Sequence, residues 1–449
     1  MAIVFLLAST RSGTWWDDTL LRIIPPVFRN ATYNIDEFGA VANNRTDSRD
    51  AVAAAIHQCN IDGGGRVLVP GPGIYFIAGP IHMKGGVELH IAGGATLKFS
   101  SVPSDYLKEG LTLTHFEGTE LYNYSPLIYG YQLTDVGVTG DGTLDGSGQA
   151  GFAKWRDKQK TDQNALRSLG NDSVPVSAVC KRQFGEGHFL RPSFLQFIGA
   201  RNLLVEGVTL IDSPFWVVHP VYSTNVIVRG ITINSPHINN DGVDPESSVD
   251  VLIENVDINS GDDCISIKSG RDADAWRVGQ SSENIIIRNM TCATGANAVC
   301  IGSEMSGGVR RVFVDGGIKV SNAGNVVQFK SNRDRGAFIE DVYIRGIVAE
   351  EAKGCISFTN SYHSWRGGNF STLFKNFTME NIHCVQTKET PISIAGLEQQ
   401  PIAEVTLRDI AVDNTGGAKP VSASGFIQLV FENVSVNGKV VPVPEIETN

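Results

Sequence analysis

A short motif of alternating apolar residues recurs along this chain and constrains its fold more than any other feature. Aligned copies are NLLVEGVTL from Asn202, NVIVRGITI from Asn225, DVLIENVDI from Asp250, NIIIRNMTC from Asn284, RVFVDGGIKV from Arg311, FIEDVYIRGI from Phe338, NFTMENIHC from Asn376 and EVTLRDIAV from Glu404. The first steps are 23 and 25 residues, and the next is 34. Alternation within each copy turns one face inward and the other toward water.

A unit of about 23 residues holds two or three short strands but no long helix, so neighbouring units have to bury one another. Leucine-rich repeats have a similar period, but their leucine spacing is absent here, and a propeller blade needs about 40 residues. The repeat therefore predicts an all-β fold, a single right-handed parallel β-helix. The 48 glycines fit the many tight turns of such a fold.

The segments outside the repeat are expected at the ends of the solenoid and around a cleft. We expect residues 1–32 to form an N-terminal extension and residues 33–449 to form the β-helix. Residues 46–60, TDSRDAVAAAIHQCN, predict a helix with Thr46 or Asp47 as its N-cap, which covers the N-terminal mouth of the solenoid. The polar segment at about 147–190 breaks the period and predicts a long loop excursion that helps to wall a cleft.

Composition excludes several classes of function. A formal net charge of -11 argues against a nucleic-acid binder, which needs a basic face. No later apolar run approaches the roughly 20 residues of a membrane span. The seven cysteines allow a disulfide or two without fixing the connectivity. The apolar run near the N-terminus is either an ordinary segment or a signal-peptide remnant, and eight Asn-X-Ser/Thr sequons favour secretion.

Three aspartates have the spacing expected for one face of neighbouring coils. Asp241 precedes Asp262 and Asp263 by 21 and 22 residues, and stacked coils lie about 4.8 Å apart. Repulsion should raise the pKa of at least one carboxyl, which places an acid beside a base. Such a pair suits glycosidic bond cleavage, and opposed side chains favour the separation of about 6.5–9.5 Å that accompanies inversion. A calcium site or solvated turn aspartates are the alternatives.

The motifs NNDGVDPESS, SGDDCISIKSGRD and IGSEMSGGV, in this order on the repeat, resemble the polygalacturonase family, glycoside hydrolase family 28. The likeness covers about residues 33–435 and is greatest to the exo-acting and plant-type or bacterial branch. It implies inverting hydrolysis of α-1,4-linked galacturonate in pectin, with Asp262 as general acid and Asp241 and Asp263 positioning and deprotonating the water. We expect no cofactor and no metal, a secreted monomer, and a pectic polysaccharide or oligogalacturonide as the partner.

The expected substrate-binding residues are Lys330, Lys268, Arg271, His219, Tyr362, Asn239 and Gln328. Three positions depart from the family pattern: Asn240 replaces a threonine, Ala296 a histidine, and Gln328 an arginine that would hold a galacturonate carboxylate. A glutamine cannot replace the bidentate arginine fork. Either other cations take over, from among Lys268, Arg271, Arg310, Arg333 and Arg335, or the leaving sugar is neutral, as in rhamnogalacturonan. The exo-type motifs favour the first explanation.

Two other classes of function remain open at this stage. A calcium-dependent pectate lyase would share the β-helix but would cleave by β-elimination. A non-catalytic pectin-binding β-helix would bind pectin without cleaving it, and the missing histidine gives that alternative some support.

Overall fold

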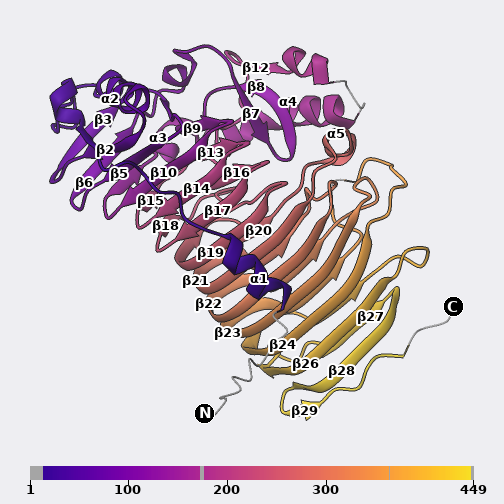
Figure 1. The fold of residues 1–449 in the computed structure, drawn as a ribbon. Coiled ribbons are helices and arrows are strands. Elements are labelled where there is room, and N and C mark those ends of the chain that lie inside the picture. The colour runs from indigo at the N-terminus through magenta and orange to yellow at the C-terminus, as the bar shows by residue number, and fades with distance from the viewer. Residues whose placement is uncertain (1–13, 172–175, 364, 446–449) are drawn as a thin grey trace, which may run out of the picture.

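The computed structural model describes residues 14–171, 176–363 and 365–445, and these form the predicted right-handed parallel β-helix. Strands of successive coils lie side by side along the axis, from the indigo N-terminal end to the yellow C-terminal end (Figure 1). The apolar run whose role as a signal-peptide remnant was left open lies outside the described residues. Among the described residues, no helix combines the length and apolarity needed to cross a membrane.

The strands of the first coils are β1 (Thr32–Asn34), β2 (Gly65–Val69), β3 (Gly73–Ile77), β4 (Ile81–His82), β5 (Val87–Ile91), β6 (Ala95–Phe99), β9 (Ile128–Tyr131), β10 (Thr134–Gly140) and β11 (Thr143–Asp145). The middle coils contain β13 (Leu195–Ile198), β14 (Arg201–Glu206), β15 (Thr209–Ile211), β16 (Val218–Val221), β17 (Thr224–Arg229), β18 (Thr232–Ser235), β19 (Val249–Ser260) and β20 (Ile265–Ile267).

The last coils contain β21 (Ser282–Ile301), β22 (Val309–Lys330), β23 (Phe338–Thr359), β24 (Leu373–Thr387), β25 (Ile392–Ala395), β26 (Ile402–Asn414), β27 (Val421–Ser424), β28 (Phe426–Val436) and β29 (Lys439–Val440). A small separate sheet joins β7 (Thr112–Phe116), β8 (Thr119–Asn123) and β12 (Gln183–Phe184). Short 3-10 helices are η1 (Ile35–Phe38), η2 (Pro103–Leu107) and η3 (Val176–Lys181).

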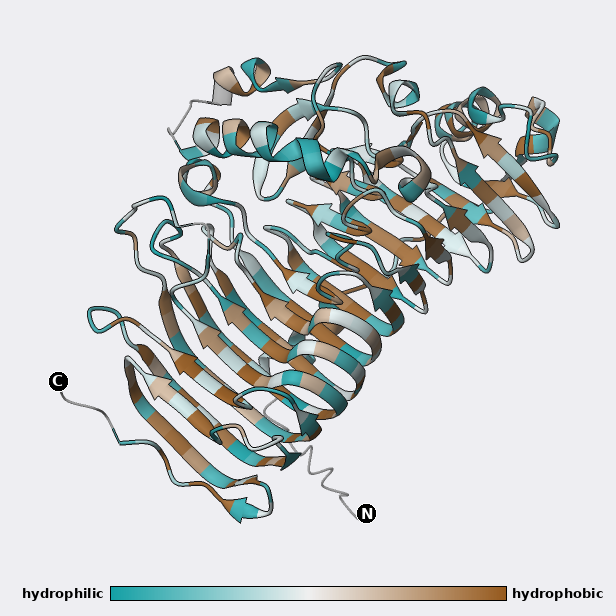
Figure 2. Cartoon of the chain, turned by 180° about the vertical axis from the view of Figure 1, so that it is seen from behind, coloured by the Kyte–Doolittle hydropathy of each residue, from teal (hydrophilic) through white to brown (hydrophobic). Residues whose placement is uncertain are grey.

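The core is built from ladders of apolar side chains, one from each coil. One ladder pairs residues in register from β14 to β26 and leaves each of them fully buried: Val205, Val228, Ile253, Ile287, Val314, Ile344, Met379 and Leu407. Brown and teal bands alternate along the strands in Figure 2, as expected when every second side chain faces the core. The repeat motif thus supplies the hydrophobic contacts between coils.

The polar residue at the start of most repeat motifs makes the turn between strands. Asn202, Asn225, Asp250 and Asn284 all have left-handed backbone conformations, with φ between 56 and 58°, which asparagine and aspartate tolerate better than most residues. Their side chains also bond from coil to coil: the Asn225 amide donates to Asn202 Oδ1 at 2.7 Å, and the Asn284 amide donates to Asp250 Oδ1 at 2.7 Å. Each turn therefore helps to set the register of the next coil.

Two helices from the start of the chain cover apolar surfaces, α2 at the N-terminal end of the solenoid and α1 on the middle coils. Helix α2 (Arg49–Ile61) packs Val52 and Ile56 into the core of the first coils, but its N-cap lies one or two residues later than expected. Its N-cap is Ser48, because the Asp47 carboxylate instead accepts from the backbone N–H groups of Arg49 and Ala78. Helix α1 (Trp15–Arg22), in the expected extension, lies along the outside of the coils (Figure 1).

The segment at about 147–190, expected to be a loop excursion, contains helix α3 (Gly148–Phe152) and helix α4 (Trp155–Asn171). Figure 1 shows α4 lying over the ends of strands in the N-terminal half, beside the short helix α5 (Asp272–Val278). Two disulfides, Cys264–Cys292 and Cys355–Cys384, link neighbouring coils. Cys264 of the first disulfide directly follows Asp263 in the sequence.

The ladder predicts that Ile287→Ala lowers the free energy of unfolding by about 2–5 kcal/mol, because it opens a cavity that the paired coils cannot close. Val348→Ala is the matched control, since Val348 is 50% exposed on β23, and it should change stability by no more than about 0.5 kcal/mol. Denaturant unfolding measures both. Equal effects of the two substitutions would contradict the ladder as the source of stability.

Candidate active site

Register places the three aspartates together. Val243, Ile265, Val299 and Val327 occupy equivalent positions in successive coils. The residues two places before them are Asp241, Asp263, Asn297 and Asn325, and they therefore stack as well. Asp262 adjoins Asp263, and oxygens of Asp241, Asp262 and Asp263 all lie within 4.8 Å of one another. The sequence separation of 21 and 22 residues, about one coil, predicted that these three carboxylates would lie together.

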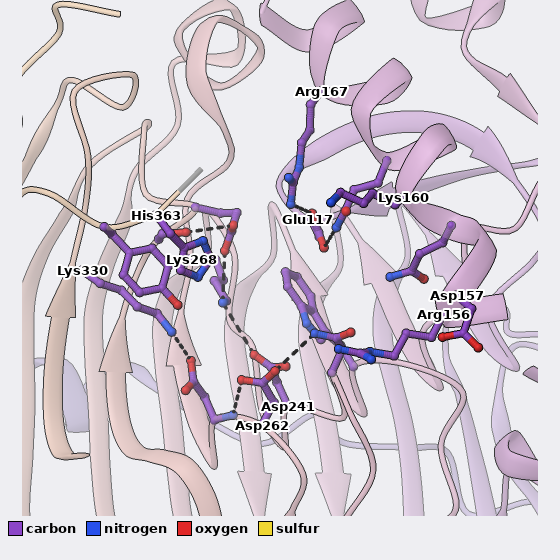
Figure 3. Close-up of a pocket in the computed structure, with 18 residues that line it drawn as sticks. Glu117, Arg156, Asp157, Lys160, Arg167, Asp241, Asp262, Lys268, Lys330 and His363 are labelled. Atoms are coloured by element: carbon purple, nitrogen blue, oxygen red, sulfur yellow. Dashed lines mark hydrogen bonds and ion pairs between the residues drawn. The ribbon is translucent and has the colours of Figure 1, made fainter. Parts of the chain in front are cut away.

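The aspartates open into a cavity of about 530 Å³ that lies between the coils and α4 (Figure 3). Its lining is strongly polar and includes Glu117, Arg156, Asp157, Gln159, Lys160, Gln163, Arg167, Trp216, Asn239, Asp241, Asp262, Asp263, Lys268, Ser303, Glu304, Lys330, Tyr362 and His363. A second cavity, of about 650 Å³, adjoins it on the C-terminal side and shares Tyr362. The two cavities provide room for a polar ligand on both sides of the aspartates.

Asp263 is held in its ionised form. Lys330 Nζ lies 2.8 Å from Asp263 Oδ2, and the Asn297 amide donates to Oδ1 at 2.5 Å. Burial opposes ionisation, but Lys330, Lys268 and these hydrogen bonds outweigh it and lower the pKa of Asp263. The site therefore contains one carboxylate that is charged across the neutral pH range.

Asp241 and Asp262 have the opposite tendency. Burial, together with repulsion from Asp262 and Asp244, raises the pKa of Asp241 well above its usual range. Burial and repulsion from Asp263 also raise the pKa of Asp262. Because these carboxyls interact, their protons belong to the group rather than to one residue. The cluster therefore holds an exchangeable proton beside the ionised Asp263.

The three carboxylates also have the spacing of a cation site, which is the alternative considered above. Lys330 Nζ already pairs with Asp263, and Lys268 Nζ lies 3.6 Å from Asp241 Oδ2. Two buried ammonium groups thus neutralise the cluster from within the protein. A metal ion would have to displace or oppose them.

The cavity brings together four of the seven residues expected to bind substrate: Lys330, Lys268, Tyr362 and Asn239. Gln328 lines the second cavity instead, together with Ala296 and the stacked Asn297 and Asn325. The positions that depart from the family pattern, Gln328 and Ala296, therefore lie on the same, C-terminal side of the aspartates.

The other two expected residues, Arg271 and His219, are buried and are not among the described residues that line the cavity. Arg271 pairs with Glu304 and Glu117, which do line it. His219 lies behind Trp216, with the two rings 4.8 Å apart. Both residues thus support the cavity wall from behind.

Three further cations considered as replacements for the missing arginine lie away from the cavity lining. Arg310 pairs with Glu283 on the outside of the coils, Arg333 bonds to Asn369, and buried Arg335 pairs with Asp272. Of the five candidates, Lys268 alone lines the cavity. Its ammonium group already contacts Asp241 and Glu304.

Helix α4 supplies residues that the motif comparison missed. Arg156, Lys160, Gln163 and Arg167 follow one another at helical spacing of three or four residues, so they share one face, and this face lines the cavity. Gln163 and Arg167 fix the helix by bonding to Glu117 at 2.5 and 2.6 Å. The helical spacing of polar residues was the available signal, but nothing in the repeat indicated where this helix would lie.

Arg191, also missed, joins α4 to the aspartates. Its buried guanidinium donates to Gln159 on α4 at 3.0 Å and to Asn239 Oδ1 at 2.7 Å. The Asn239 amide donates in turn to Asp262 Oδ2 at 3.3 Å. Burial lowers the pKa of Arg191 to about 10, which still leaves it charged at neutral pH. The Arg191 side chain thus fixes both α4, which forms one wall of the cavity, and Asn239, which hydrogen-bonds to Asp262.

A buried His-Glu-His chain supports the floor of the site. Glu246 accepts from His219 Nε2 at 2.8 Å and pairs with His115 Nδ1 at 3.1 Å, while Gln196 bonds to His219 Nδ1 at 2.9 Å. Burial opposes the charge on Glu246, but the two histidines lower its pKa to about 2. Burial likewise opposes a charged His115, but Glu246 outweighs it and raises the pKa of His115.

This chain makes stability depend on pH in two directions. The lowered pKa of Glu246 stabilises the fold above about pH 4.5, and this contribution is lost as the pH falls toward about 2. The raised pKa of His115 stabilises the fold below about pH 6.5 and is lost as the pH rises past the folded-state value. Glu246→Gln should lower the free energy of unfolding by about 3–5 kcal/mol, as for a broken buried pair.

Denaturant unfolding between pH 2 and 8 measures this prediction, and Glu246→Gln should lose less stability on acidification than the unsubstituted protein. Glu350→Gln is the control, because Glu350 is exposed and its loss removes the same formal charge. An unchanged acid dependence in Glu246→Gln would contradict the assignment.

Comparison with known proteins identifies relatives that are glycoside hydrolases, as the carboxylate cluster indicates. The model of glycosyl hydrolases family 28 matches residues 84–428. A probable polygalacturonase from Vitis vinifera is 26% identical over 403 residues, covering 86% of this chain and 75% of the relative. The structure of an exopolygalacturonase from Thermotoga maritima is 35% identical, covers 93% of this chain and 95% of that one, and superposes with a TM-score of 0.86.

A family 28 exopolygalacturonase from Yersinia enterocolitica has the same fold, with a TM-score of 0.73 at 19% identity over 90% of this chain and 76% of that one. The extent of the family match confirms the resemblance drawn from the aspartate motifs. This chain belongs to glycosyl hydrolases family 28 and is a glycoside hydrolase.

Proposed function

We propose that this enzyme hydrolyses α-1,4-linked galacturonate in pectic polysaccharides and acts from the chain end. The observation that carries the proposal is the cluster of Asp241, Asp262 and Asp263, with Asp263 ionised and a proton shared by the other two. The polygalacturonases and exopolygalacturonases to which the chain is similar support the choice of substrate.

The three aspartates divide the reaction between them in this proposal. Asp262 is the most accessible of them, and it donates its proton to the glycosidic oxygen as the bond to C1 breaks. Asp263 and Asp241 hold a water molecule, and the ionised Asp263 takes up the water proton as the oxygen bonds to C1. The proton that Asp263 took from water then passes to Asp262, which restores the acid form of Asp262 and the ionised form of Asp263.

The separation of the carboxylates differs from the sequence-based expectation. Opposed side chains were expected to be about 6.5–9.5 Å apart, the usual range for inversion, but oxygens of all three lie within 4.8 Å. Ion pairs with Lys330 and Lys268 reduce the repulsion that this close packing creates. We infer inversion from family membership and from the placement of two carboxylates, Asp241 and Asp263, beside the acid, and not from their separation.

End action follows from the position of α4. The helix lines the cavity opposite Lys330 and His363 (Figure 3), and Gln163 and Arg167 fasten it to Glu117. A wall fixed on this side limits the number of sugars that fit beyond the aspartates. The second cavity, on the C-terminal side, then accepts the rest of the polymer.

A specific observation also favours a neutral leaving sugar, as in rhamnogalacturonan. Gln328 lies in the second cavity, among the amides of Asn297, Asn322 and Asn325, and these suit hydroxyl groups as well as carboxylates. Lys353 and Lys388 also line this cavity, so a galacturonate there remains our first choice. Rates on galacturonan and rhamnogalacturonan oligomers decide between them.

We infer that the enzyme works outside the cell as a monomer. Disulfides persist in oxidising compartments, and the two disulfides therefore support secretion.

Hydrolysis predicts that polygalacturonate yields new reducing ends without ultraviolet absorbance from an unsaturated product, and that a chelator leaves the rate unchanged. Asp262→Asn should lower kcat by about 100- to 10,000-fold, because the amide cannot donate the proton. Absorbing products that require calcium would instead identify a lyase. Binding without new ends on any pectic polymer would identify a non-catalytic protein.

Arg191→Lys should lower kcat up to about 100-fold while the fold remains intact, because lysine keeps the charge but cannot join Gln159 to Asn239 and so misplaces Asp262. The control is Arg201→Lys, at an exposed arginine on β14. Steady-state kinetics and thermal unfolding measure both variants. A wild-type kcat in Arg191→Lys would show that the connection does not position Asp262.

A further inference from the structure

The basic residues that line the main cavity differ in whether the protein already neutralises them. Lys330 pairs with Asp263, Lys268 with Glu304 and Asp241, and Arg167 with Glu117. Burial lowers the pKa of His363, so it is largely neutral at pH 7. Among the described lining residues, Arg156 and Lys160 are the two permanent cations to which the structure gives no carboxylate partner.

These two cations lie on the same face of α4. They are four residues apart, and the helix that carries them is anchored at its other end by Gln163 and Arg167. Figure 3 shows Arg156 extending from α4 toward Asp241 and Asp262. Asp157 also lines the cavity, but an adjacent residue projects about 100° around the helix. Both cations thus line the cavity that holds the reacting centre, and Arg156 points toward that centre.

Two unpaired cations at this spacing repel each other, and a carboxylate placed between them removes that repulsion. A guanidinium can bind a carboxylate with two parallel hydrogen bonds, and an ammonium adds a third donor. The ligand class that fits this arrangement is therefore an anionic sugar, and a neutral sugar would leave both cations without a partner.

The position of the pair identifies which sugar it meets. Gln328 and the amide-lined second cavity lie on the C-terminal side of the aspartates, where we place the leaving part of the polymer. Helix α4 lies on the other side, where the chain ends. We propose that Arg156 and Lys160 bind the C6 carboxylate of the terminal galacturonate, the sugar that is released. This inference rests on the end-acting function proposed above and adds the group that selects the terminal sugar.

The assignment also accounts for the loss of an arginine at Gln328. Recognition of the acidic group is transferred from the leaving sugar to the terminal one, so the enzyme requires a free carboxylate at the chain end. A methyl ester at that position removes the charge and fills the space between the cations, while esterification of the next sugar has a smaller effect.

The test compares two trigalacturonates that differ only in the non-reducing terminal sugar, which is a free acid in one and a 6-O-methyl ester in the other. The unsubstituted enzyme should prefer the free acid. The variant Arg156→Gln with Lys160→Gln should lose about 10- to 100-fold in kcat/KM on the free acid, mostly through KM, and little on the ester. The preference should therefore nearly disappear.

The control variant, Lys154→Gln with Lys158→Gln, removes the same two charges from lysines of the same segment that are not among the described lining residues. It should keep the preference for the free acid, and thermal unfolding should show both variants folded. An unchanged preference in the Arg156 and Lys160 variant, or an equal loss on both substrates, would overturn the proposal. Failure of the unsubstituted enzyme to cleave the free acid would instead overturn the proposed function.

Discussion

Parallel stacking of one coil on the next, in register, is the constraint on which the rest of this structure depends. It brings equivalent residues of successive coils to about one strand spacing, so each position in the repeat becomes a ladder. Apolar positions give the buried ladder through Ile253 and Ile287, and turn positions give the ladder of Asn202 and Asn225. The same register brings Asp241 beside Asp263, so the active site is one more product of the stacking.

Stacking carboxylates has an electrostatic cost, and the surrounding coils offset it. Lys268 and Lys330 occupy equivalent positions two coils apart, with Gly302 between them, and they contact Asp241 and Asp263 respectively. Asp262 accepts hydrogen bonds from the Asn239 amide and from the backbone N–H of Asp263. Asp263 is the ionised member because Lys330 and the Asn297 amide bond to it directly. Lys268 lies farther from Asp241, at 3.6 Å, and does not offset the burial and carboxylate repulsion that raise the pKa of Asp241.

The sequence was informative wherever the repeat or a family motif applied. The β-helix and the meeting of the three aspartates could be predicted because both depend on one period, and Lys268, Lys330, Asn239 and Tyr362 followed from the motifs. The period could not show that His219 and Arg271 turn away from the cavity, because a strand position alone does not say which polar groups lie behind it. Glu246 and Glu304 bind them there.

The positions of helix α4 and Arg191 could not be predicted from the sequence, for a different reason. The segment that contains α4 has no period, so nothing local fixes where it packs. Its place depends on the contacts of Gln163 and Arg167 with Glu117 and of Gln159 with Arg191, which join residues 32 to 50 positions apart. Such contacts leave no regular pattern in a single sequence. In this protein they place α4, which forms the wall at one end of the cavity.

The most direct test of the account is to follow hexagalacturonate during its first turnovers by proton NMR and product sizing. Three aspartates that hold a water beside the acid, in a cavity closed by α4, predict galacturonic acid as the first product, released as the β-anomer, together with the pentamer. Release of the α-anomer would contradict the proposed water attack. Early appearance of dimers and trimers in place of the monomer would contradict a cavity that accepts one chain end.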